Sequence, residues 1–477
     1  MIWLRMNDVR YENDIRALLM AFFPGEKIVL DNIRFQPDKT MDVVYEDDQA
    51  RISWTDQDGT LDGETGGLDE DYRIAKNQIK MTVYDLLSRR TGHELPWGTL
   101  TGIRPTKIPM GFYDRGQTVE EADAYLEKAY KVSASKRRLC TLVASNEKRI
   151  LDTIPFGEDI SLYIGIPFCP TICLYCSFSS FPLKVWEKRV PAYLNALFKE
   201  MDAVAKMIGG RKITTVYMGG GTPTSLTAAQ MDSLLTKVEE TFDLSHVREF
   251  TVEAGRPDSL NRKKLEVIYD HGIRRISINP QSMNQKTLDI IGRRHTALQV
   301  EEAFRMARDV GFTNINMDLI MGLPGEDVQD VAHTLETVRT LGPDSMTVHS
   351  LAVKRASRLN RNLEAYPPAP PQTVNEMIEM SWEAAETMGM VPYYMYRQKN
   401  ISGNLENVGY AKPGYEGIYN ILIMEEKQTI IALGAGGSSK IVFPEENRIE
   451  RIENVKNVKD YIERIDEMIE RKRKMLL

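Results

Sequence analysis

One pattern constrains the fold of this chain more than any other: after about residue 160, short apolar segments alternate with longer amphipathic ones. The apolar, β-like segments lie at 161–168, 212–218, 249–254, 274–280, 314–321 and 345–351. The helical patterns between them lie at about 187–208, 227–242, 259–271, 297–311 and 327–341. Such alternation is typical of a parallel sheet, because parallel strands need long crossover connections. It predicts an α/β fold, arranged as a partial (β/α)6 barrel or as a doubly wound open sheet.

The segments that follow the predicted strands are the least generic in the chain. They read CPTICLYC, GGGTPTS, GRPD, QSMNQ, GLPGE and AVKRAS. In a barrel and in an open parallel sheet alike, the carboxyl ends of the strands meet at one edge, and the loops there carry the chemistry. We therefore expect the active site to be built from these segments.

Three of the four cysteines fall within the first of these segments, as Cys169-x3-Cys173-x2-Cys176, whereas Cys140 stands alone in a predicted helix. Thiolates at such intervals in a loop can hold three irons of a cubane iron–sulfur cluster, which leaves the fourth iron open to another ligand. The alternative is a zinc site with a distant fourth ligand. Zinc sites usually pair Cys-x2-Cys or add histidines, and no histidine lies nearby. The spacing therefore favours an iron–sulfur cluster, with Cys140 a structural residue.

The composition is that of an ordinary globular protein. Of 477 residues, 42% are apolar and 27% charged, which excludes a collagen, a fully disordered chain and a disulfide mini-scaffold. A net charge of −7 gives no overall attraction to nucleic acid or anionic lipid. The first residues are charged too early for a signal peptide, and no stretch approaches the length of an apolar membrane span. A cytoplasmic protein is expected.

The segments on either side of the repeat differ from it in pattern. Residues 1–95 are predicted to form an N-terminal α+β domain, with strands at 1–7, 27–35 and 41–54, helices at 13–23 and 71–90, and a Gly-rich loop at 56–71. Residues 96–158 are interpreted as a connector and helical segment, and residues 159–365 as the barrel. A C-terminal α+β extension, 366–477, is predicted to hold a helix at 373–388, a strand at 391–400, a hairpin at 421–437 and a charged helix at 453–475.

The cysteine spacing at the end of the first barrel strand resembles the radical S-adenosylmethionine (radical SAM) superfamily. Further motifs resemble one of its branches, the oxygen-independent coproporphyrinogen III dehydrogenase family, over about residues 160–440. They are Tyr163-Ile-Gly-Ile-Pro-Phe-Cys169, Gly219-Gly-Gly-Thr-Pro223, Gln281, Asp318-Leu-Ile-Met-Gly-Leu-Pro324 and Gly409-Tyr-Ala-Lys-Pro-Gly-Tyr415. The N-terminal extension with TLTGIRPTK is most similar to the HemZ-type subgroup of Gram-positive bacteria. The resemblance implies a radical SAM barrel with a [4Fe-4S] cluster and S-adenosyl-L-methionine as cofactors.

The resemblance also implies a set of site residues, in which Cys169, Cys173 and Cys176 are the metal ligands. It assigns the cofactor's ribose hydroxyls to Glu253 and its carboxylate to Arg293, with the adjacent Arg294 as the alternative. The glycines after the second strand lack Cβ atoms, so backbone carbonyls can approach the cofactor's ammonium group. The complete predicted cofactor site is Tyr163, Gly219, Gly220, Gly221, Thr222, Glu253, Gln281, Arg293 and Asp318.

The activity that the resemblance implies is oxidative decarboxylation of coproporphyrinogen III propionates to give protoporphyrinogen IX, a step of porphyrin and haem biosynthesis. Two alternatives stay open: a radical SAM enzyme that trims or opens haem, and a non-enzymatic haem chaperone. Two departures from the family bear on them. Phe178 stands where the dehydrogenases proper carry a further cysteine, and Tyr419 stands where the chaperone branch carries its haem-binding histidine. The second departure argues against a chaperone with the same haem ligand.

The remaining expectations concern partners and weaker candidates. A tetrapyrrole substrate and an electron donor such as flavodoxin or ferredoxin are expected, with no nucleic acid, no membrane and a monomeric state. Arginines in the site should pair with propionates. The candidates are Arg355, Arg358 and Arg397, whereas His271 and His295 are expected to be solvated.

Overall fold

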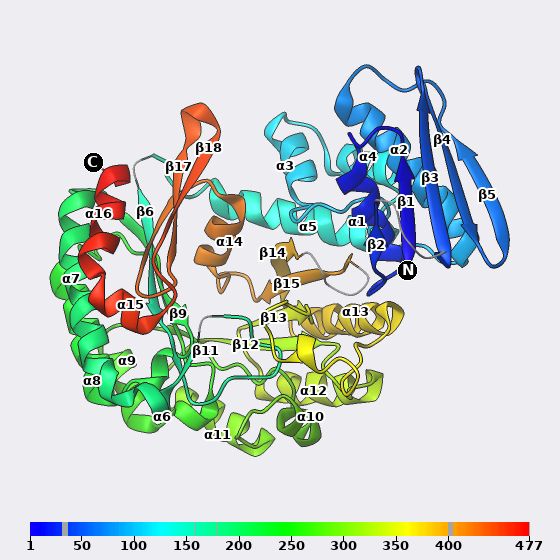
Figure 1. Cartoon of the computed structure of the whole chain (residues 1–477). Helices are drawn as coiled ribbons and strands as arrows, with labels where there is room; N and C mark the ends of the chain where they lie inside the picture. The colour runs from blue at the N-terminus through cyan, green and yellow to red at the C-terminus, as the bar shows by residue number, and fades with distance from the viewer. Residues whose placement is uncertain (31–36, 158, 179, 399–403, 477) are drawn as a thin grey trace. The chain divides into compact units, whose positions relative to one another are not determined.

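The computed structural model describes residues 1–30, 37–157, 159–178, 180–398 and 404–476 (Figure 1). The chain divides into two compact units. The first consists of Met1–Ser145, Pro370–Asn375 and Met395–Glu406. The second consists of Asn146–Ala369, Glu376–Tyr394 and Asn407–Leu477. The segments predicted at 1–95 and 159–365 therefore fall in different units, and the other two predicted segments are each divided between both.

The centre of the second unit is a set of six parallel strands that lie side by side in chain order. They are β6 (Ile160–Ile166), β9 (Ile213–Gly220), β10 (Glu249–Glu253), β11 (Arg275–Ser277), β12 (Asn314–Met321) and β13 (Ser345–Ser350). The crossover helices, which flank the strands in Figure 1, are α7 (Val190–Ile208), α8 (Ala228–Thr241), α9 (Arg262–Asp270), α11 (Ala297–Val310) and α12 (Val328–Leu341). A doubly wound sheet would reverse its strand order at a switch point. The uninterrupted order confirms the predicted α/β fold of six β/α repeats.

Local signals in the sequence explain where the crossover helices begin and end. The caps Thr227, Thr296 and Asp327 each form a capping box, in which the cap and the residue three positions later exchange hydrogen bonds. Helices α11 and α12 end at Gly311 and Gly342, which have left-handed φ values of 118° and 67°. These caps fix the crossover lengths, so the strand-end loops return to the same edge of the sheet.

Short elements complete the crossovers. After β6, the chain forms a small parallel pair, β7 (Phe168–Cys169) with β8 (Phe181–Pro182), and then α6 (Leu183–Trp186). Helix α10 (Gln285–Ile290) precedes α11, and α13 (Pro371–Thr387) follows β13. Among the described residues, no helix has the length and apolar character needed to cross a bilayer.

C-terminal strands extend the six-stranded sheet at both edges. Strand β16 (Thr429–Leu433) runs parallel to β6, and β17 (Ser438–Phe443) and β18 (Arg448–Glu453) follow it antiparallel. At the other edge lie β15 (Glu406–Ala411), antiparallel to β13, and β14 (Val391–Arg397). The hairpin predicted at 421–437 is wrong, because residues up to Glu425 form helix α14 (Ile418–Glu425). Its apolar side chains Ile421 and Leu422 are buried, so tertiary packing overrides their strand propensity.

The helix predicted at 453–475 is two helices, α15 (Val458–Glu463) and α16 (Ile465–Leu476), which pack on α7. They surround a fully buried carboxylate, Glu200 of α7. Glu200 pairs with Lys472 at 2.7 Å and accepts hydrogen bonds from Tyr461, Asn454 and the backbone of Gly434 at 2.6–2.8 Å. A buried charge needs such partners, so this network ties the C-terminal helices to the barrel.

The first unit contains a five-stranded sheet with strand order β2-β1-β3-β4-β5. Its strands are β1 (Ile2–Met6), β2 (Ile28–Val29), β3 (Lys39–Glu46), β4 (Gln49–Asp56) and β5 (Gly59–Glu64). Its helices are α1 (Glu12–Phe22), α2 (Tyr72–Thr91), α3 (Lys107–Asp114), α4 (Val119–Tyr130) and the start of α5 (Ala134–Leu151). The loop predicted at 56–71 is partly wrong, because β5 pairs antiparallel with β4 and its solvated side chains hide the strand pattern. Of the strand predicted at 27–35, residues 31–35 lie outside the described residues.

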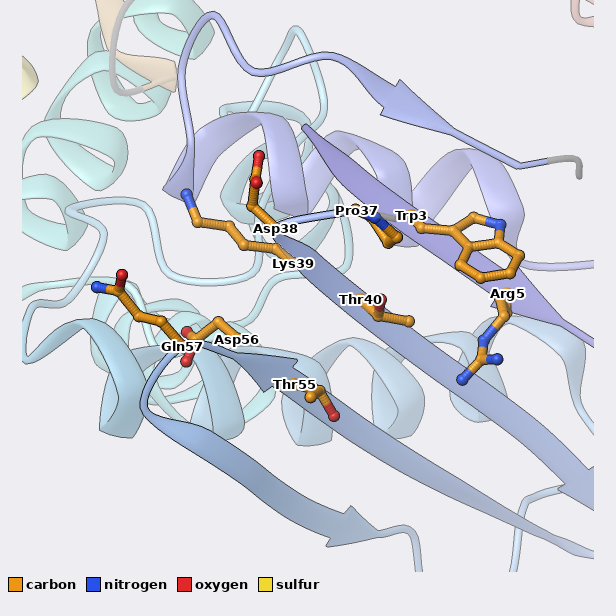
Figure 2. A pocket seen from close by; sticks show the side chains of 9 residues that line it. All are labelled: Trp3, Arg5, Pro37, Asp38, Lys39, Thr40, Thr55, Asp56 and Gln57. Carbon is orange, nitrogen blue, oxygen red and sulfur yellow. The ribbon is translucent and has the colours of Figure 1, made fainter. Parts of the chain in front are cut away.

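A hollow of about 720 Å³ lies in the first unit, at the start of β1 and β3 and the end of β4 (Figure 2). Its charged side chains already have partners: Arg5 pairs with Asp42, and Lys39 pairs with Glu26. None of the predicted site residues lines this hollow. The predicted site residues belong instead to the second unit.

Candidate active site

The cysteine segment lies directly after β6, where a barrel of parallel strands places its chemistry. The backbone of Leu174 donates to Ile291 O and accepts from Leu359 N, both at 2.9 Å. The Leu174 side chain packs in a buried apolar cluster with Leu288, Ile291, Ile320, Leu323, Leu351 and Leu359. Residues between the cysteines thus anchor the segment.

Burial changes the acidity of two of these thiols. Burial raises the pKa of Cys169 to about 11, while a contact at 3.5 Å with the hydroxyl of Thr222 acts in the other direction. Burial also raises the pKa of Cys176. Thiols with a raised pKa stay protonated at neutral pH unless a metal supplies positive charge. Three thiols within eight residues are a donor set that fits an iron–sulfur cluster, and metal binding would release their protons.

Close contacts within the chain explain why residues 219–221 are glycines. A Cβ atom on Gly219 would lie 2.8–2.9 Å from the carboxylate of Glu253. A Cβ atom on Gly221 would lie 2.7 Å from Phe168 O, and Gly220 has a φ of 110°. Hydrogen bonds from Gly221 N to Ile166 O and from Thr222 N to Phe168 O, at 2.8 and 2.7 Å, hold this segment beside the cysteines. Its contact with the cofactor's ammonium stays a prediction.

Glu253 ends β10 and has a perturbed acidity. Burial raises its pKa to about 7, and the negative charge of Asp318 adds to this effect. The hydroxyl of Tyr217 opposes both by donating a hydrogen bond to the carboxylate. Perturbed carboxylates of this kind concentrate at functional sites.

Three tyrosines stack beneath this carboxylate. The rings of Tyr217 and Tyr419 lie 4.5 Å apart, and Tyr163 lies 6.3–6.4 Å from each. Tyr163 was predicted to be a cofactor-site residue, and a Cβ atom on Gly220 would lie 3.2 Å from its hydroxyl. Tyr419 is 4% exposed, and burial raises its pKa well above the ordinary value. The sequence did not reveal this stack, because its members are far apart along the chain.

Gln281 and Asp318 are joined through the backbone, and the side chain of Arg293 contacts the nearby Asn279. Gln281 has a left-handed φ of 67°, its N donates to Asp318 O at 2.9 Å, and its O accepts from Ile320 N at 3.0 Å. Such strained backbone is often found at functional sites. Arg293 is buried and donates to Asn279 O, whereas Arg294 is exposed. Of the two candidate arginines, Arg293 is therefore the one that faces inward.

Several polar atoms in this region are buried without a partner. They are Oε1 of Gln281, Nε of Arg293, Oδ1 of Asn279 and Oγ of Ser277. Leaving such atoms unpaired is costly, and native proteins rarely do so without a ligand or water. Hydrogen-bonding groups that await a polar ligand fit the amino acid and ribose parts of S-adenosylmethionine.

Sequence reasoning missed a group that supports the cysteine segment. Arg256, which follows β10, donates to Thr171 O and to Thr171 Oγ1, and it pairs with Asp258. His295 lies behind Asp258 with its side chain fully buried, so the expectation that it is solvated is wrong. The only signal in the sequence was the position of GRPD after a strand, which is too generic to assign a role.

The three arginines proposed to bind propionates have different environments. Arg397 belongs to the first unit, where it is 2% exposed, lies over the ring of Trp97 and donates to Leu100 O and Asn404 O. These contacts hold its guanidinium group within the first unit, whereas Nη2 is buried without a partner, so its role in propionate binding stays a prediction. Arg358 donates to Ile172 O beside the cysteines, and Arg355 is exposed.

Comparisons with known proteins agree with this geometry. Residues 163–338 match the radical SAM superfamily. The oxygen-independent coproporphyrinogen-III oxidase-like protein HemZ of Bacillus subtilis (strain 168) is 42% identical over 445 residues, which cover 89% of each chain. Heme chaperone HemW of the same organism is 33% identical over 284 residues, 59% of this chain and 71% of HemW.

The fold has a solved counterpart. Coproporphyrinogen III oxidase (HemN) from Escherichia coli, a radical SAM enzyme, matches with a TM-score of 0.54 at 23% identity, over 68% of this chain and 73% of HemN. The superfamily's cofactors are a [4Fe-4S] cluster and S-adenosylmethionine, as predicted. The protein belongs to the radical SAM superfamily and, within it, to the HemZ-type family of oxygen-independent coproporphyrinogen-III oxidase-like proteins.

Proposed function

We propose that this protein is a radical SAM enzyme that acts on a tetrapyrrole, and that its reaction is the oxygen-independent oxidative decarboxylation of coproporphyrinogen III to protoporphyrinogen IX. The name of its HemZ relative supports the substrate class. The observation that carries the proposal is the meeting, at one sheet edge, of the cysteine segment with buried, unpartnered polar atoms of Gln281 and Arg293.

The roles of the residues follow from their chemistry. The thiolates of Cys169, Cys173 and Cys176 would hold the cluster. Arg293 would offer a forked donor to the cofactor's carboxylate. When bound, the cluster and S-adenosylmethionine would supply the radical chemistry that removes a hydrogen atom from a propionate; the loss of carbon dioxide would then pass one electron to an external one-electron acceptor. The chain's contribution is to orient these groups and to exclude water.

Glu253 and Asp318 would bind the polar parts of the cofactor. Glu253 would accept hydrogen bonds from the ribose hydroxyls, which its ionised form does best. The hydrogen bond from Tyr217 lowers the pKa of Glu253 against burial and so keeps a share of it ionised near neutral pH. Asn316 Nδ2 donates to Asp318 Oδ1 at 2.7 Å, which fixes one carboxylate oxygen and leaves the other for a ligand.

Haem delivery without catalysis is the second candidate, because the relative HemW is named a chaperone. Modification of haem by the same radical chemistry is a third reading. The burial of Tyr419 within a tyrosine stack weighs against delivery through this residue, because a haem iron would have to displace the stack. We further propose that the protein acts as a cytoplasmic monomer and takes its electron from a flavodoxin or ferredoxin.

The test is an anaerobic incubation of the reconstituted protein with S-adenosylmethionine, a reductant and either coproporphyrinogen III or haem. Mass spectrometry should detect protoporphyrinogen IX and 5′-deoxyadenosine in the first mixture, and Cys173→Ala should give neither. Methylthioadenosine with an altered haem would instead indicate ring opening. Stable haem binding without cofactor cleavage would indicate delivery.

A further inference from the structure

A buried cation, Arg256, lies at the cysteine segment. Arg256 is 4% exposed. Its Nη1 lies 3.6 Å from Sγ of Cys173 and also donates to Thr171 O at 3.2 Å. Its Nη2 donates to Thr171 Oγ1 at 2.9 Å. The guanidinium group therefore contacts the segment at both residues.

The charges around Arg256 are few. Asp258 accepts hydrogen bonds from Nε and Nη2 at 2.9 and 2.7 Å, so the Nη1 corner points away from the carboxylate and toward the sulfur. His295 Nδ1 lies 3.8 Å from Asp258, and burial lowers the pKa of this histidine, which favours the neutral imidazole. Arg293, the other buried cation of this region, donates to Asn279 O. Arg256 is thus the cation in contact with Cys173, and Asp258 is its partner. A third charged group, the exposed Arg358, donates to Ile172 O.

We propose that Arg256 is a positioning residue for the cluster: it holds the cysteine segment through Thr171 and donates an N–H···S hydrogen bond to Cys173, thereby raising the cluster's reduction potential. This inference rests on the proposed role of the three cysteines. Reduction adds one electron, delivered by the external donor, so the reduced cluster is the more negative state. A buried cation beside a cluster ligand stabilises that state, because interactions between charges are strong where water is excluded. Hydrogen bonds to the sulfurs and the net charge nearby set cluster potentials in general.

Substitutions of Arg256 and of Asp258 are expected to shift the midpoint potential of the cluster in opposite directions. Arg256→Gln removes the cation and should shift the midpoint potential to more negative values. Asp258→Asn removes the anion that offsets the cation and should shift the potential to more positive values. A merely structural disturbance has no reason to move the two variants in opposite directions.

The experiment is a redox titration of the cluster, followed by electron paramagnetic resonance, on full-length protein reconstituted without oxygen and measured without S-adenosylmethionine. The variants are Arg256→Gln, Arg256→Lys and Asp258→Asn. Arg256→Lys keeps the charge but loses the fork, so its potential should lie between those of wild type and Arg256→Gln. Arg274→Gln is the control, because this exposed arginine precedes β11 at the opposite end of the strands.

Each outcome decides the matter. Shifts in opposite directions, with an unchanged control and equal iron content, support the role of Arg256. Equal potentials in all iron-loaded variants, or shifts of the same sign in Arg256→Gln and Asp258→Asn, overturn it and leave the proposed function intact. If Arg256→Gln fails to load iron, the sign of the Asp258→Asn shift decides. A wild-type protein that binds no cluster would overturn the proposed function and this inference together.

Discussion

The phenol of Tyr217 donates a 2.6 Å hydrogen bond to Oε1 of Glu253, across the neighbouring parallel strands β9 and β10. The bond favours the ionised carboxylate, while burial favours the protonated form, and burial wins. The result is a carboxylic acid that titrates near neutral pH, far from the value of about 4.3 in an unfolded chain. Two measurable consequences follow for this residue.

The first prediction concerns the pH dependence of stability. Because the folded-state pKa of Glu253 is raised, the folded state binds its proton more tightly than the unfolded state does. Ionising Glu253 in the folded state therefore has a free-energy cost. This cost is absent below the unfolded pKa, grows as the pH rises, and is complete above about pH 7. Glu253→Gln should raise the free energy of unfolding of the cofactor-free protein at pH 8 and leave it unchanged at pH 4. Urea unfolding measures both, and equal effects at the two pH values would contradict the assigned acidity.

The second prediction concerns binding of S-adenosylmethionine. Glu253→Ala or Asp318→Ala should leave the iron content largely intact and weaken the binding of S-adenosylmethionine. Loss of a charge-assisted hydrogen bond costs about 1.5–3 kcal/mol, or roughly ten- to a hundredfold in affinity. Equilibrium binding to the reconstituted protein measures this loss. Unchanged affinity in both variants would remove these residues from the site.

The third prediction concerns the ligands of the cluster. Protein purified without oxygen should carry one oxygen-labile four-iron cluster, which Cys173→Ala should abolish. Cys140→Ala should retain it, because Cys140 is buried in α5 of the first unit. Iron analysis and the visible spectrum report on both variants. An equal loss of iron in the two would show that the ligands are assigned wrongly.

The fourth prediction concerns the glycine segment. Gly221→Ala should destabilise the protein by about 1–3 kcal/mol, the usual cost of overpacking, because its Cβ atom would meet backbone atoms of residues 166–168. Gly210→Ala is the matched control, since a Cβ atom there meets nothing within 4 Å. Thermal unfolding compares the two, and similar melting temperatures would refute the close approach.

The fifth prediction concerns haem. Tyr419→Phe should keep radical turnover, because this tyrosine is a packing residue whose phenol stays protonated. Iron ligation by tyrosine would need the phenolate. Cofactor cleavage and the haem absorbance spectrum are the two measurements. Loss of a haem band with cleavage unaffected would favour delivery over catalysis.

The sequence predicted the parts of the fold that repeat. Six apolar strands and five crossover helices follow from local periodicity and capping, and the cysteine spacing indicates its own chemistry. What it could not predict is pairing between distant segments. Strand β16 pairs with β6, although most of the sequence of the second unit lies between them. The sequence of β16 alone suggested a hairpin. The helix α14 before it is set by packing rather than by propensity.

The sequence also did not predict which polar side chains are buried. His295 was expected to be solvated and Arg397 was a candidate for pairing with a propionate, yet both are buried. Their environments consist of residues remote along the chain, such as Trp97 and Asp258. Arg256 escaped notice for the same reason, because only the fold brings it to Cys173.

The network around Glu200 also bears on how the protein is made. A chain emerges from the ribosome in order, and early segments begin to fold before late ones exist. Glu200 is fully buried, and its charged partner Lys472 lies 272 residues further along the chain. Until Lys472 is synthesised the carboxylate has no cation in this network, so helix α7 lacks the partner that stabilises its buried charge. The cysteine segment precedes α7 in the chain, so the helix that follows it would reach its full stability only once α15 and α16 have formed.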